Sequence, residues 1–162
     1  MIRNPNAVQR LLHRFFMLQP VTAFFSTRVQ GIDRVVLAFT NGRRTATEIL
    51  GWNVIQLITL GAKTGQLRRV SLLALFDGET IGLIASNFGR KRKPGWYYNL
   101  RAHPECQVEW KGSPRTYRAR EVNGQEYGKY WQLAVSCYQG YERYRVLASH
   151  RQVPIMVLDL KA

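Results

Sequence analysis

The sequence predicts an α+β fold, a six-stranded and mostly antiparallel β-barrel with helices over its openings. Six short stretches have the composition or alternation of strands, and turn signals such as Asp77-Gly78 and Gly112-Ser113-Pro114 separate some of them. Apolar residues at helical spacing occur near the start of the chain and over residues 125–137. The length of 162 residues suits one domain with a proper core.

The predicted strands can be placed in order along the chain. Alternating or continuously apolar residues indicate strands at residues 53–60, 68–76, 80–86, 106–111, 115–122 and 153–160. Pro154 stands at the start of the last strand, where a missing N–H is tolerated. Between the third and fourth strands, Pro94-Gly95 introduces a short helix over residues 96–103, which Pro104 ends.

The first part of the chain, residues 1–51, is expected to form a helical arm beside the barrel domain of residues 52–162. Residues 4–18 place apolar side chains on one helical face and basic side chains on the opposite one. Such a helix can lie on an acidic membrane, or it can pack on its own barrel or on a partner subunit. The longest uncharged run near the N-terminus, residues 15–27, is too short to span a bilayer.

The formal net charge of +14 implies an anionic partner. Nucleic acid, an acidic membrane surface and an anionic small molecule all satisfy the charge, which does not choose among them. Cys106 and Cys137 are far apart in sequence, match no metal-ligand spacing and suggest no disulfide framework. A cytoplasmic location is therefore expected, and the basic arm leaves membrane association open.

A glycine-containing turn between the first two strands is the strongest candidate for an anion-binding site. It runs Gly61-Ala62-Lys63-Thr64-Gly65-Gln66 and is followed by Arg68. Its glycines allow backbone angles that place several N–H groups on one side, and Lys63, Thr64 and Arg68 add two cations and a hydroxyl. Such a loop binds phosphate or carboxylate. The alternative is an ordinary hairpin turn with solvated basic residues.

Other catalytic patterns are missing from the sequence. Lys63-Thr64-Gly65 has neither an S-x-x-K nor an S-D-N partner, and the residue order of a P-loop is absent. His13, His103 and His150 form no ligand spacing with cysteines or carboxylates, so no metal site is expected. No Ser/His/Asp grouping is visible, and hydrolysis therefore has no support.

Two aromatic groups allow both a functional and a structural interpretation. Around residues 90–99, Trp96 and its neighbours could stack on nucleic-acid bases, or Trp96 could anchor the helix in the core. Tyr138, Tyr141 and Tyr144 recur every three residues. Such tyrosines are often packing residues, but phenols at a barrel mouth can also hold and protonate a carbonyl or nitro oxygen.

Residues 53–160 resemble the deazaflavin-dependent nitroreductase and quinone reductase family, which uses coenzyme F420 in a split β-barrel. The landmarks are a G-x-K-[ST]-G-x-x-R turn, an Ala-Ser strand end, a W-Y-x-N-L helix followed by proline, an R-A-R-E-V strand, a Y-x-G-Y-x-x-Y run and a final apolar strand. Here they are formed by Gly61, Lys63, Thr64, Gly65, Arg68, Ala85, Ser86, Trp96, Tyr97, Asn99, Leu100, Pro104, residues 118–122, Tyr138, Gly140, Tyr141, Tyr144 and residues 155–160. The resemblance implies a fold similar to the FMN-binding split barrels.

The resemblance also implies a role for each site residue. The cofactor's phosphate would be held by Lys63, Thr64, Gly65 and Arg68, with Ala62 and Gln66 completing the turn. Its ribitol and ring would be lined by Ser86, Asn87, Trp96 and Asn99, with Phe88 and Gly89 beside them. The substrate would be faced by Tyr138, Tyr141 and Tyr144, with Tyr141 orienting or protonating the acceptor. Many relatives have lysine at the position of Asn87 and arginine at that of Ala62, and residues 90–93 can supply charge from the adjacent loop.

The implied activity is hydride transfer from reduced coenzyme F420 to a quinone, a nitroaromatic compound or an activated alkene. A basic rim suits the phosphodiester and glutamate tail of this cofactor, and a protein that positions a hydride donor needs neither a nucleophile nor a metal. The alternatives are a split barrel that binds FMN or haem and a basic nucleic-acid-binding module. With F420 as the cofactor, no nucleic acid is expected as a partner, and a homodimer is left open.

Overall fold

A computed structural model describes residues 53–112 and 114–161, and all of them except Asn53 belong to one compact unit, Val54–Ala162. The helical arm expected over residues 1–51 lies outside the described residues. The described residues contain seven strands, three α-helices and one short 3-10 helix.

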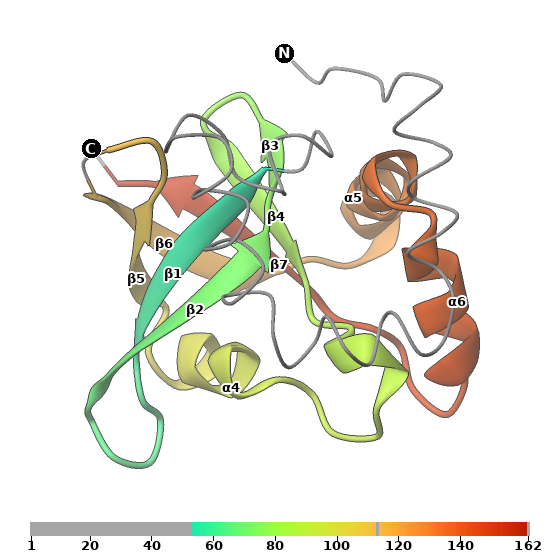
Figure 1. The fold of residues 1–162 in the computed structure, drawn as a ribbon, viewed down its shortest axis with the longest axis horizontal. Helices are drawn as coiled ribbons and strands as arrows, with labels where there is room; N and C mark the ends of the chain where they lie inside the picture. Colours follow the sequence, from blue (N-terminus) through green and yellow to red (C-terminus); the bar gives the residue numbers. More distant parts are fainter. Residues whose placement is uncertain (1–52, 113, 162) are drawn as a thin grey trace, which may run out of the picture. The chain divides into compact units, whose positions relative to one another are not determined.

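The seven strands form one antiparallel sheet (Figure 1). They are β1 (Val54–Leu60), β2 (Leu67–Leu73), β3 (Leu75–Asp77), β4 (Thr80–Ile84), β5 (Glu105–Glu109), β6 (Pro114–Glu121) and β7 (Ile155–Leu160). Their order across the sheet is β2-β1-β5-β6-β7-β4-β3, and every neighbouring pair is antiparallel. The predicted α+β class and the antiparallel pairing are confirmed.

The prediction of six strands is wrong, because the second predicted strand is divided in two. Residues 68–76 are predicted as one strand, but β2 pairs with β1 whereas β3 pairs with β4. Ala74, which is 2% exposed, lies between the two segments. The chain thus leaves one edge of the sheet and continues at the other edge. This path requires the sheet to curl, so β2 and β3 are the edges of a split-barrel-like sheet.

The other predicted bounds agree with the structure to within two residues. The predicted strand at residues 106–111 ends early, at Glu109. Lys111 and Gly112 have φ values of 51° and 130°, so the chain has already entered the turn to β6. The sequence predicts that this turn begins at Gly112, one residue after Lys111, where the structure has it begin.

β7 lies inside the sheet, between β6 and β4. Leu158 pairs with Ala119 of β6 on one side and with Ile81 of β4 on the other. From Ile155 to Leu158 no residue is more than 1% exposed. Burial on both faces explains why this strand is apolar at every position from Ile155 to Leu158 rather than alternating.

The main core lies against the curled sheet and includes the buried face of α4 (Gly95–Ala102). Trp96, Tyr97 and Leu100 of this helix belong to the same core cluster as inward-facing residues of β1, β4, β5 and β6. The Tyr97 hydroxyl donates to Glu121 Oε2 at 2.9 Å, which links the helix to the end of β6. These contacts place α4 at one end of the sheet (Figure 1).

Two further helices complete the described fold. α5 (Gly124–Cys137) contacts β3 and β7, and α6 (Gly140–Leu147) contacts α5 and the 3-10 helix η1 (Asn87–Gly89). At Gly82 of β4, an added Cβ would lie 2.5 Å from the ring of Tyr130, so the approach of α5 to the sheet requires glycine there. Among the described residues, no helix has both the length and the apolar character needed to cross a membrane.

Candidate functional site

The turn between β1 and β2 closes on itself through backbone hydrogen bonds. The Gly61 N–H donates to the Gln66 carbonyl oxygen at 2.8 Å, and the Gly65 N–H donates to the Gly61 carbonyl oxygen at 2.8 Å. The Gln66 N–H makes a longer contact, 3.4 Å, with Thr64 Oγ1. Gly65 has a φ of 63°, which favours glycine, and a Cβ on Gly61 would lie 2.8 Å from Thr64 Oγ1. Both glycines are therefore needed for this compact turn.

Only part of the turn's backbone remains open to a ligand. Three of its N–H groups are used within the turn, and that of Ala62 donates to Asn99 Oδ1 at 3.0 Å. Within the described part of the chain, the N–H groups of Lys63 and Thr64 make no hydrogen bond. The sequence predicts several N–H groups facing an anion; the structure leaves these two, at the exposed tip of the turn.

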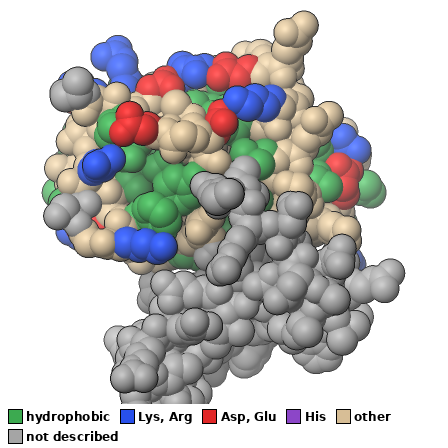
Figure 2. Space-filling model, turned by 90° about the horizontal axis from the view of Figure 1, so that it is seen from above, with side chains coloured by type: hydrophobic (Ala, Val, Ile, Leu, Met, Phe, Trp, Pro, Cys, Tyr) green, Lys and Arg blue, Asp and Glu red, His purple; other side chains and the backbone are tan. Residues whose placement is uncertain are grey.

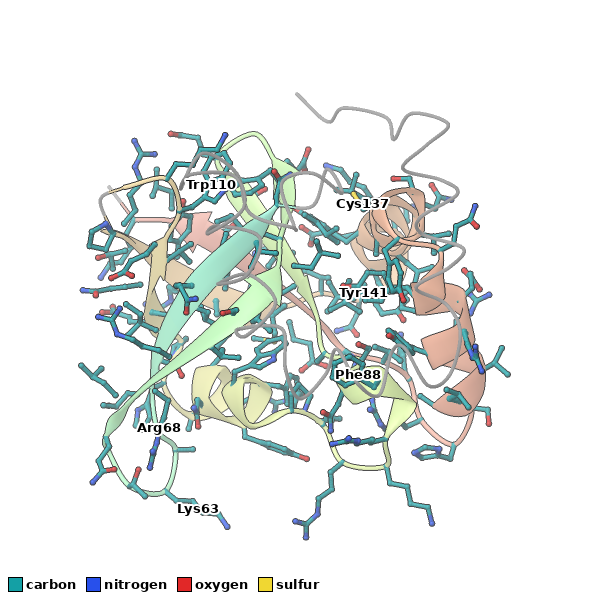
Figure 3. All side chains as sticks on the ribbon, in the orientation of Figure 1. Lys63, Arg68, Phe88, Trp110, Cys137 and Tyr141 are labelled. Atoms are coloured by element: carbon teal, nitrogen blue, oxygen red, sulfur yellow. The ribbon has the colours of Figure 1, made fainter. Side chains whose placement is uncertain are left out.

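Lys63 and Arg68 are exposed cations on this hairpin (Figure 3). Arg68 Nη2 donates to the side-chain oxygen of Gln66 at 3.1 Å, which holds the guanidinium against the turn. Neither cation pairs with a carboxylate among the described residues, whereas the adjacent Arg69 is bound by Glu109 at 3.0 Å. Lys63 and Arg68 are therefore free to pair with an anionic ligand.

Asn99 links the turn to α4. Its Oδ1 accepts the hydrogen bond from Ala62, and its Nδ2 donates to Thr59 Oγ1 at 3.0 Å. Trp96, one turn earlier in the helix, is 7% exposed and belongs to the core cluster. The resemblance implies that Asn99 and Trp96 line the cofactor; in the structure both side chains also have partners within the protein, and they position the turn and the helix.

A left-handed turn follows β4 and contains Ser86, Asn87, Phe88 and Gly89. The φ values of Asn87, Phe88 and Gly89 are 46°, 57° and 76°, a conformation that is unfavourable for phenylalanine. Ser86 is 8% exposed, and its carbonyl oxygen accepts a hydrogen bond from the Gly89 N–H at 2.9 Å. A Cβ on Gly89 would lie 2.5 Å from Leu147 Cβ, so α6 packs directly against this turn.

The basic residues Arg90, Lys91, Arg92 and Lys93 follow the left-handed turn and are exposed or half-exposed. Asn87 Nδ2 donates to the Arg92 carbonyl oxygen at 2.7 Å, which ties this basic loop back to the turn. Residues 80–104 contain no aspartate or glutamate, so all the charged side chains of this segment are basic. By contrast, the face shown in Figure 2 carries acidic side chains among the basic ones.

Tyr138, Tyr141 and Tyr144 form an aromatic cluster at α6. Their ring centroids are 5.7, 6.1 and 6.2 Å apart in the three pairs, and none of the three residues is more than 9% exposed. The ring of Phe88 meets that of Tyr144 edge-on, with centroids 5.8 Å apart. The left-handed turn and the tyrosine cluster are therefore in direct contact.

Burial raises the pKa of the Tyr141 and Tyr144 hydroxyls well above their ordinary value. Burial is the largest cause for both groups, and the neighbouring Cys137 and Tyr138 add to it for Tyr141. Both phenols keep their protons at neutral pH and can donate hydrogen bonds. Among the described residues, the Tyr144 hydroxyl is hydrogen-bonded to Tyr138, whereas the Tyr141 hydroxyl makes no side-chain hydrogen bond.

The predicted site residues form two groups, which other elements connect. The hairpin turn is bonded to α4 through Asn99, and α4 follows directly on the basic loop and the left-handed turn. The left-handed turn also contacts the tyrosine cluster, because Phe88 packs against Tyr144. Figure 3 shows Lys63 and Arg68 on one side of α4, and Phe88 and Tyr141 on the other.

One residue of this region escapes the sequence analysis. Arg151 Nη2 donates to the carbonyl oxygens of Ser86 at 3.3 Å and Arg90 at 2.9 Å. Arg151 belongs to none of the motifs, and its acceptors are more than sixty residues away in sequence. No local pattern could have indicated this contact.

The donors of the site suit an anionic organic group. Backbone N–H groups, a threonine hydroxyl and two unpaired cations bind phosphate or carboxylate. The described residues contain no cluster of histidine, cysteine, aspartate or glutamate side chains able to hold a metal ion. The side chains of the hairpin therefore fit a cofactor that has a phosphodiester and a carboxylate tail.

The fold and the site together define a protein with a split-barrel-like sheet and an exposed cationic hairpin. More particularly, the chain belongs to the F420H(2)-dependent quinone reductase family, whose model matches residues 32–159. It is an oxidoreductase that uses coenzyme F420 and transfers a hydride from the reduced cofactor to a quinone. The cofactor that the resemblance implies, and hydride transfer to a quinone, are thereby confirmed, while nitroaromatic and alkene acceptors stay predictions.

Individual relatives agree with this assignment. The protein named F420H(2)-dependent quinone reductase Rv1261c of Mycobacterium tuberculosis is 35% identical over 106 residues, which are 63% of this chain and 70% of that protein. A solved structure described as an F420-H2 dependent reductase, FDR-A, is 30% identical with a TM-score of 0.61, over 66% of this chain and 94% of that chain.

Two other solved structures extend the comparison. One, described as a domain-swapped dimer, is 26% identical with a TM-score of 0.62, over 85% of this chain and 98% of that chain. A heme binding protein from Mycobacterium smegmatis, 16% identical with a TM-score of 0.53 over 68% of this chain and 47% of that chain, shows a similar fold alone.

Proposed function

We propose that the β1–β2 hairpin binds the phosphodiester of coenzyme F420 through Lys63, Thr64 and Arg68. The observation that carries this proposal is the pair of exposed cations without carboxylate partners, next to two unused N–H groups at the tip of the same turn. Charge-assisted hydrogen bonds of this kind are about twice as strong as neutral ones. The basic loop of residues 90–93 adds positive charge for the carboxylate tail.

Asn99 and Arg68 keep the hairpin ready to bind the phosphodiester. The Asn99 amide holds the Ala62 N–H on α4, and the Arg68 guanidinium rests on the Gln66 side chain. Donors fixed before the ligand arrives lose less conformational entropy on binding. When bound, reduced F420 supplies the hydride, and the protein positions the cofactor and the acceptor against each other.

We further propose that the tyrosine cluster holds the oxygen of the acceptor. The Tyr141 hydroxyl keeps its proton, because burial raises its pKa, and no described residue takes up that proton in a hydrogen bond. A phenol in this state donates a hydrogen bond to an acceptor oxygen and stabilises the negative charge that develops there on reduction. Phe88, 45% exposed and in contact with Tyr144, offers an aromatic edge to a flat acceptor ring.

The same donors support a wider range of acceptors than quinones. A hydroxyl that recognises a quinone carbonyl can also bind a nitro group or the carbonyl of an activated alkene, since all three accept hydrogen bonds through oxygen. Nitroaromatic compounds and activated alkenes are therefore proposed as further acceptors. Steady-state rates with one member of each class would test this range.

Cofactor binding tests the role of the hairpin. In a titration of the full chain with F420, Lys63→Ala with Arg68→Ala should raise the Kd at least about tenfold, or about 1.4 kcal/mol. The matched control is Arg69→Ala with Lys111→Ala, which removes the same charge but leaves Lys63 and Arg68 in place. An equal loss in both double variants would show that net charge, rather than the hairpin, binds the cofactor. Parallel titrations with FMN and haem test the alternative cofactors.

Turnover tests the role of the tyrosines. Tyr141→Phe keeps the ring packing and removes only the hydroxyl, so kcat with a quinone should fall about tenfold or more while the Kd for F420 stays the same. Unchanged turnover in Tyr141→Phe would show that another group protonates or orients the acceptor.

Assembly and location are proposed separately. The solved relative described as a domain-swapped dimer supports a homodimer for this chain, which light scattering would detect. A cytoplasmic location is proposed because the two cysteines suggest no disulfide framework, and peripheral membrane contact through residues 1–51 because that segment has a basic amphipathic pattern. Flotation with anionic vesicles, compared with neutral vesicles, tests the membrane contact.

A further inference from the structure

The guanidinium of Arg151 is surrounded by backbone carbonyl groups. Its Nη2 donates to Arg90 at 2.9 Å and to Ser86 at 3.3 Å, and its Nη1 makes a longer contact with the Gln152 carbonyl oxygen at 3.4 Å. Ser86 and Arg90 are the two ends of the left-handed turn. One side chain therefore joins both ends of that turn and connects them to the segment that leads into β7.

The turn that Arg151 bridges is unfavourable without outside support. It contains three successive left-handed residues, two of which, Asn87 and Phe88, are not glycine. Its own hydrogen bonds are those from the Gly89 N–H to Ser86 at 2.9 Å and from the Arg90 N–H to Asn87 at 3.1 Å. A conformation of this kind persists only where the surrounding structure imposes it, and Arg151 provides part of that structure.

The charge of Arg151 has no carboxylate partner among the described residues. In addition, its Nε is buried and has no hydrogen-bond partner within the part of the chain that the structure describes. The residue lies directly beside the basic loop, so repulsion between like charges acts against this placement. The bonds to the two carbonyl oxygens oppose that repulsion. A planar guanidinium can serve both carbonyl oxygens from one rigid group, which the single ammonium of a lysine does less well.

We propose that Arg151 is a positioning residue for cofactor binding. By joining Ser86 to Arg90, it keeps the turn left-handed, and this conformation directs Phe88 onto Tyr144 and sets the start of the basic loop. The effect on the cofactor rests on the proposed function of that loop. The effect on the conformation of the turn does not depend on the cofactor.

The local test is amide hydrogen exchange at Gly89 and Arg90, measured by NMR on the full chain without cofactor. Arg151→Met keeps the aliphatic stem and removes the bonds to both carbonyls, so exchange at these two amides should become about tenfold faster. Amides of β1 and β5 should exchange at unchanged rates. Arg115→Met, an exposed arginine on β6 outside the site, is the control and should leave both amides unchanged.

The functional test is the Kd for F420. Arg151→Met should raise it about tenfold. Arg151→Lys keeps the positive charge but loses the planar guanidinium that bonds both carbonyl oxygens. It should therefore show fast exchange and weakened F420 binding, like Arg151→Met. If Arg151→Lys behaves like the wild type in both measurements, the positive charge alone matters and the positioning role is wrong. Arg151→Lys also carries the test if Arg151→Met does not fold.

The two proposals can fail separately. Absence of F420 binding by the wild-type chain would overturn the proposed role of the hairpin and the basic loop, while the exchange rates would still decide whether Arg151 holds the turn. Unchanged exchange at Gly89 and Arg90 in Arg151→Met would overturn the positioning role even if F420 binds as proposed.

Discussion

The side-chain oxygen of Asn99 accepts a hydrogen bond from the backbone N–H of Ala62, with 3.0 Å between the two atoms. The same amide donates to the hydroxyl of Thr59, a residue of β1 that is 1% exposed. One side chain of α4 therefore holds both the last part of β1 and the first residues of the turn that follows it. The binding turn and the helix are expected to move as one body.

Replacing Asn99 should separate its structural role from its electrostatic one. Asn99→Ala leaves the buried Thr59 hydroxyl without its partner, and the free energy of unfolding should fall by about 1–3 kcal/mol. Asn99→Asp can accept hydrogen bonds from both Ala62 and Thr59, so it should recover most of this stability. Its negative charge beside the turn should still weaken F420 binding. Urea denaturation and cofactor titration measure the two effects, and an Asp variant that binds F420 as well as the wild type would contradict the proposed anion site.

Phe88 should show an unusual order of stability among its variants. Because its φ of 57° is costly for any residue with a Cβ, Phe88→Gly should be more stable than Phe88→Ala, by about 1 kcal/mol. Both variants lose the edge contact with Tyr144, and both should raise the KM for a quinone. Urea denaturation gives the order of stability. An alanine variant as stable as the glycine variant would mean that the left-handed conformation is not maintained in solution.

Gly140 should not tolerate a side chain. A Cβ at this position would collide with the ring of Tyr138, so Gly140→Ala should lower the free energy of unfolding by about 1–3 kcal/mol and displace that tyrosine. Gly128→Ala in α5 is the control, since nothing lies within 4 Å of a Cβ there. That variant should stabilise the protein by about 0.5–1 kcal/mol through helix propensity. Thermal unfolding of both variants provides the measurement.

Stability should decline in alkaline solution. Burial raises the pKa of the Cys106 thiol to about 12 from its ordinary value of 9.0. Below pH 9 the thiol is protonated in both the folded and the unfolded chain, and its contribution is fully present. Between pH 9 and pH 12 only the unfolded chain ionises, so stability falls as the pH rises. The raised pKa values of Tyr141 and Tyr144 act in the same direction.

Melting temperatures at pH 7, 9 and 10.5 would check this prediction. Cys106→Ala removes the titrating thiol, so its melting temperature should change less between pH 9 and pH 10.5 than that of the wild type. The same decline in both proteins would assign the alkaline transition to the tyrosines or to other groups.

Local patterns were sufficient for most of the fold. Apolar periodicity located most strands and α5, prolines marked α4, and Asp77-Gly78 marked the hairpin between β3 and β4, whereas α6 was not predicted. The break at Ala74 could not be located, because the apolar run around it contains no glycine or proline. What ends β2 there is the position of two pairing partners, β1 and β4, that belong to opposite parts of the sheet. That information is tertiary and absent from any short window.

The site shows the same division. The motif indicated the hairpin with Lys63 and Arg68, and the structure leaves both cations unpaired. The number of open N–H groups was overestimated, since the turn itself uses three of them and Asn99 binds a fourth. The link from Asn99 to Ala62 spans 37 residues, and those of Arg151 span 61 and 65. Side chains that act through such distant contacts carry no recognisable local signature.

The placement of β7 between β6 and β4 has a consequence for biosynthesis. β4 and β6 do not pair with each other; β7, residues 155–160, pairs with both. The two parts of the sheet therefore cannot join until β7 has left the ribosome. Between the synthesis of Glu121 and that of β7, the growing chain therefore carries open edges at both β4 and β6. A chaperone that binds those edges would protect them until β7 fills the gap.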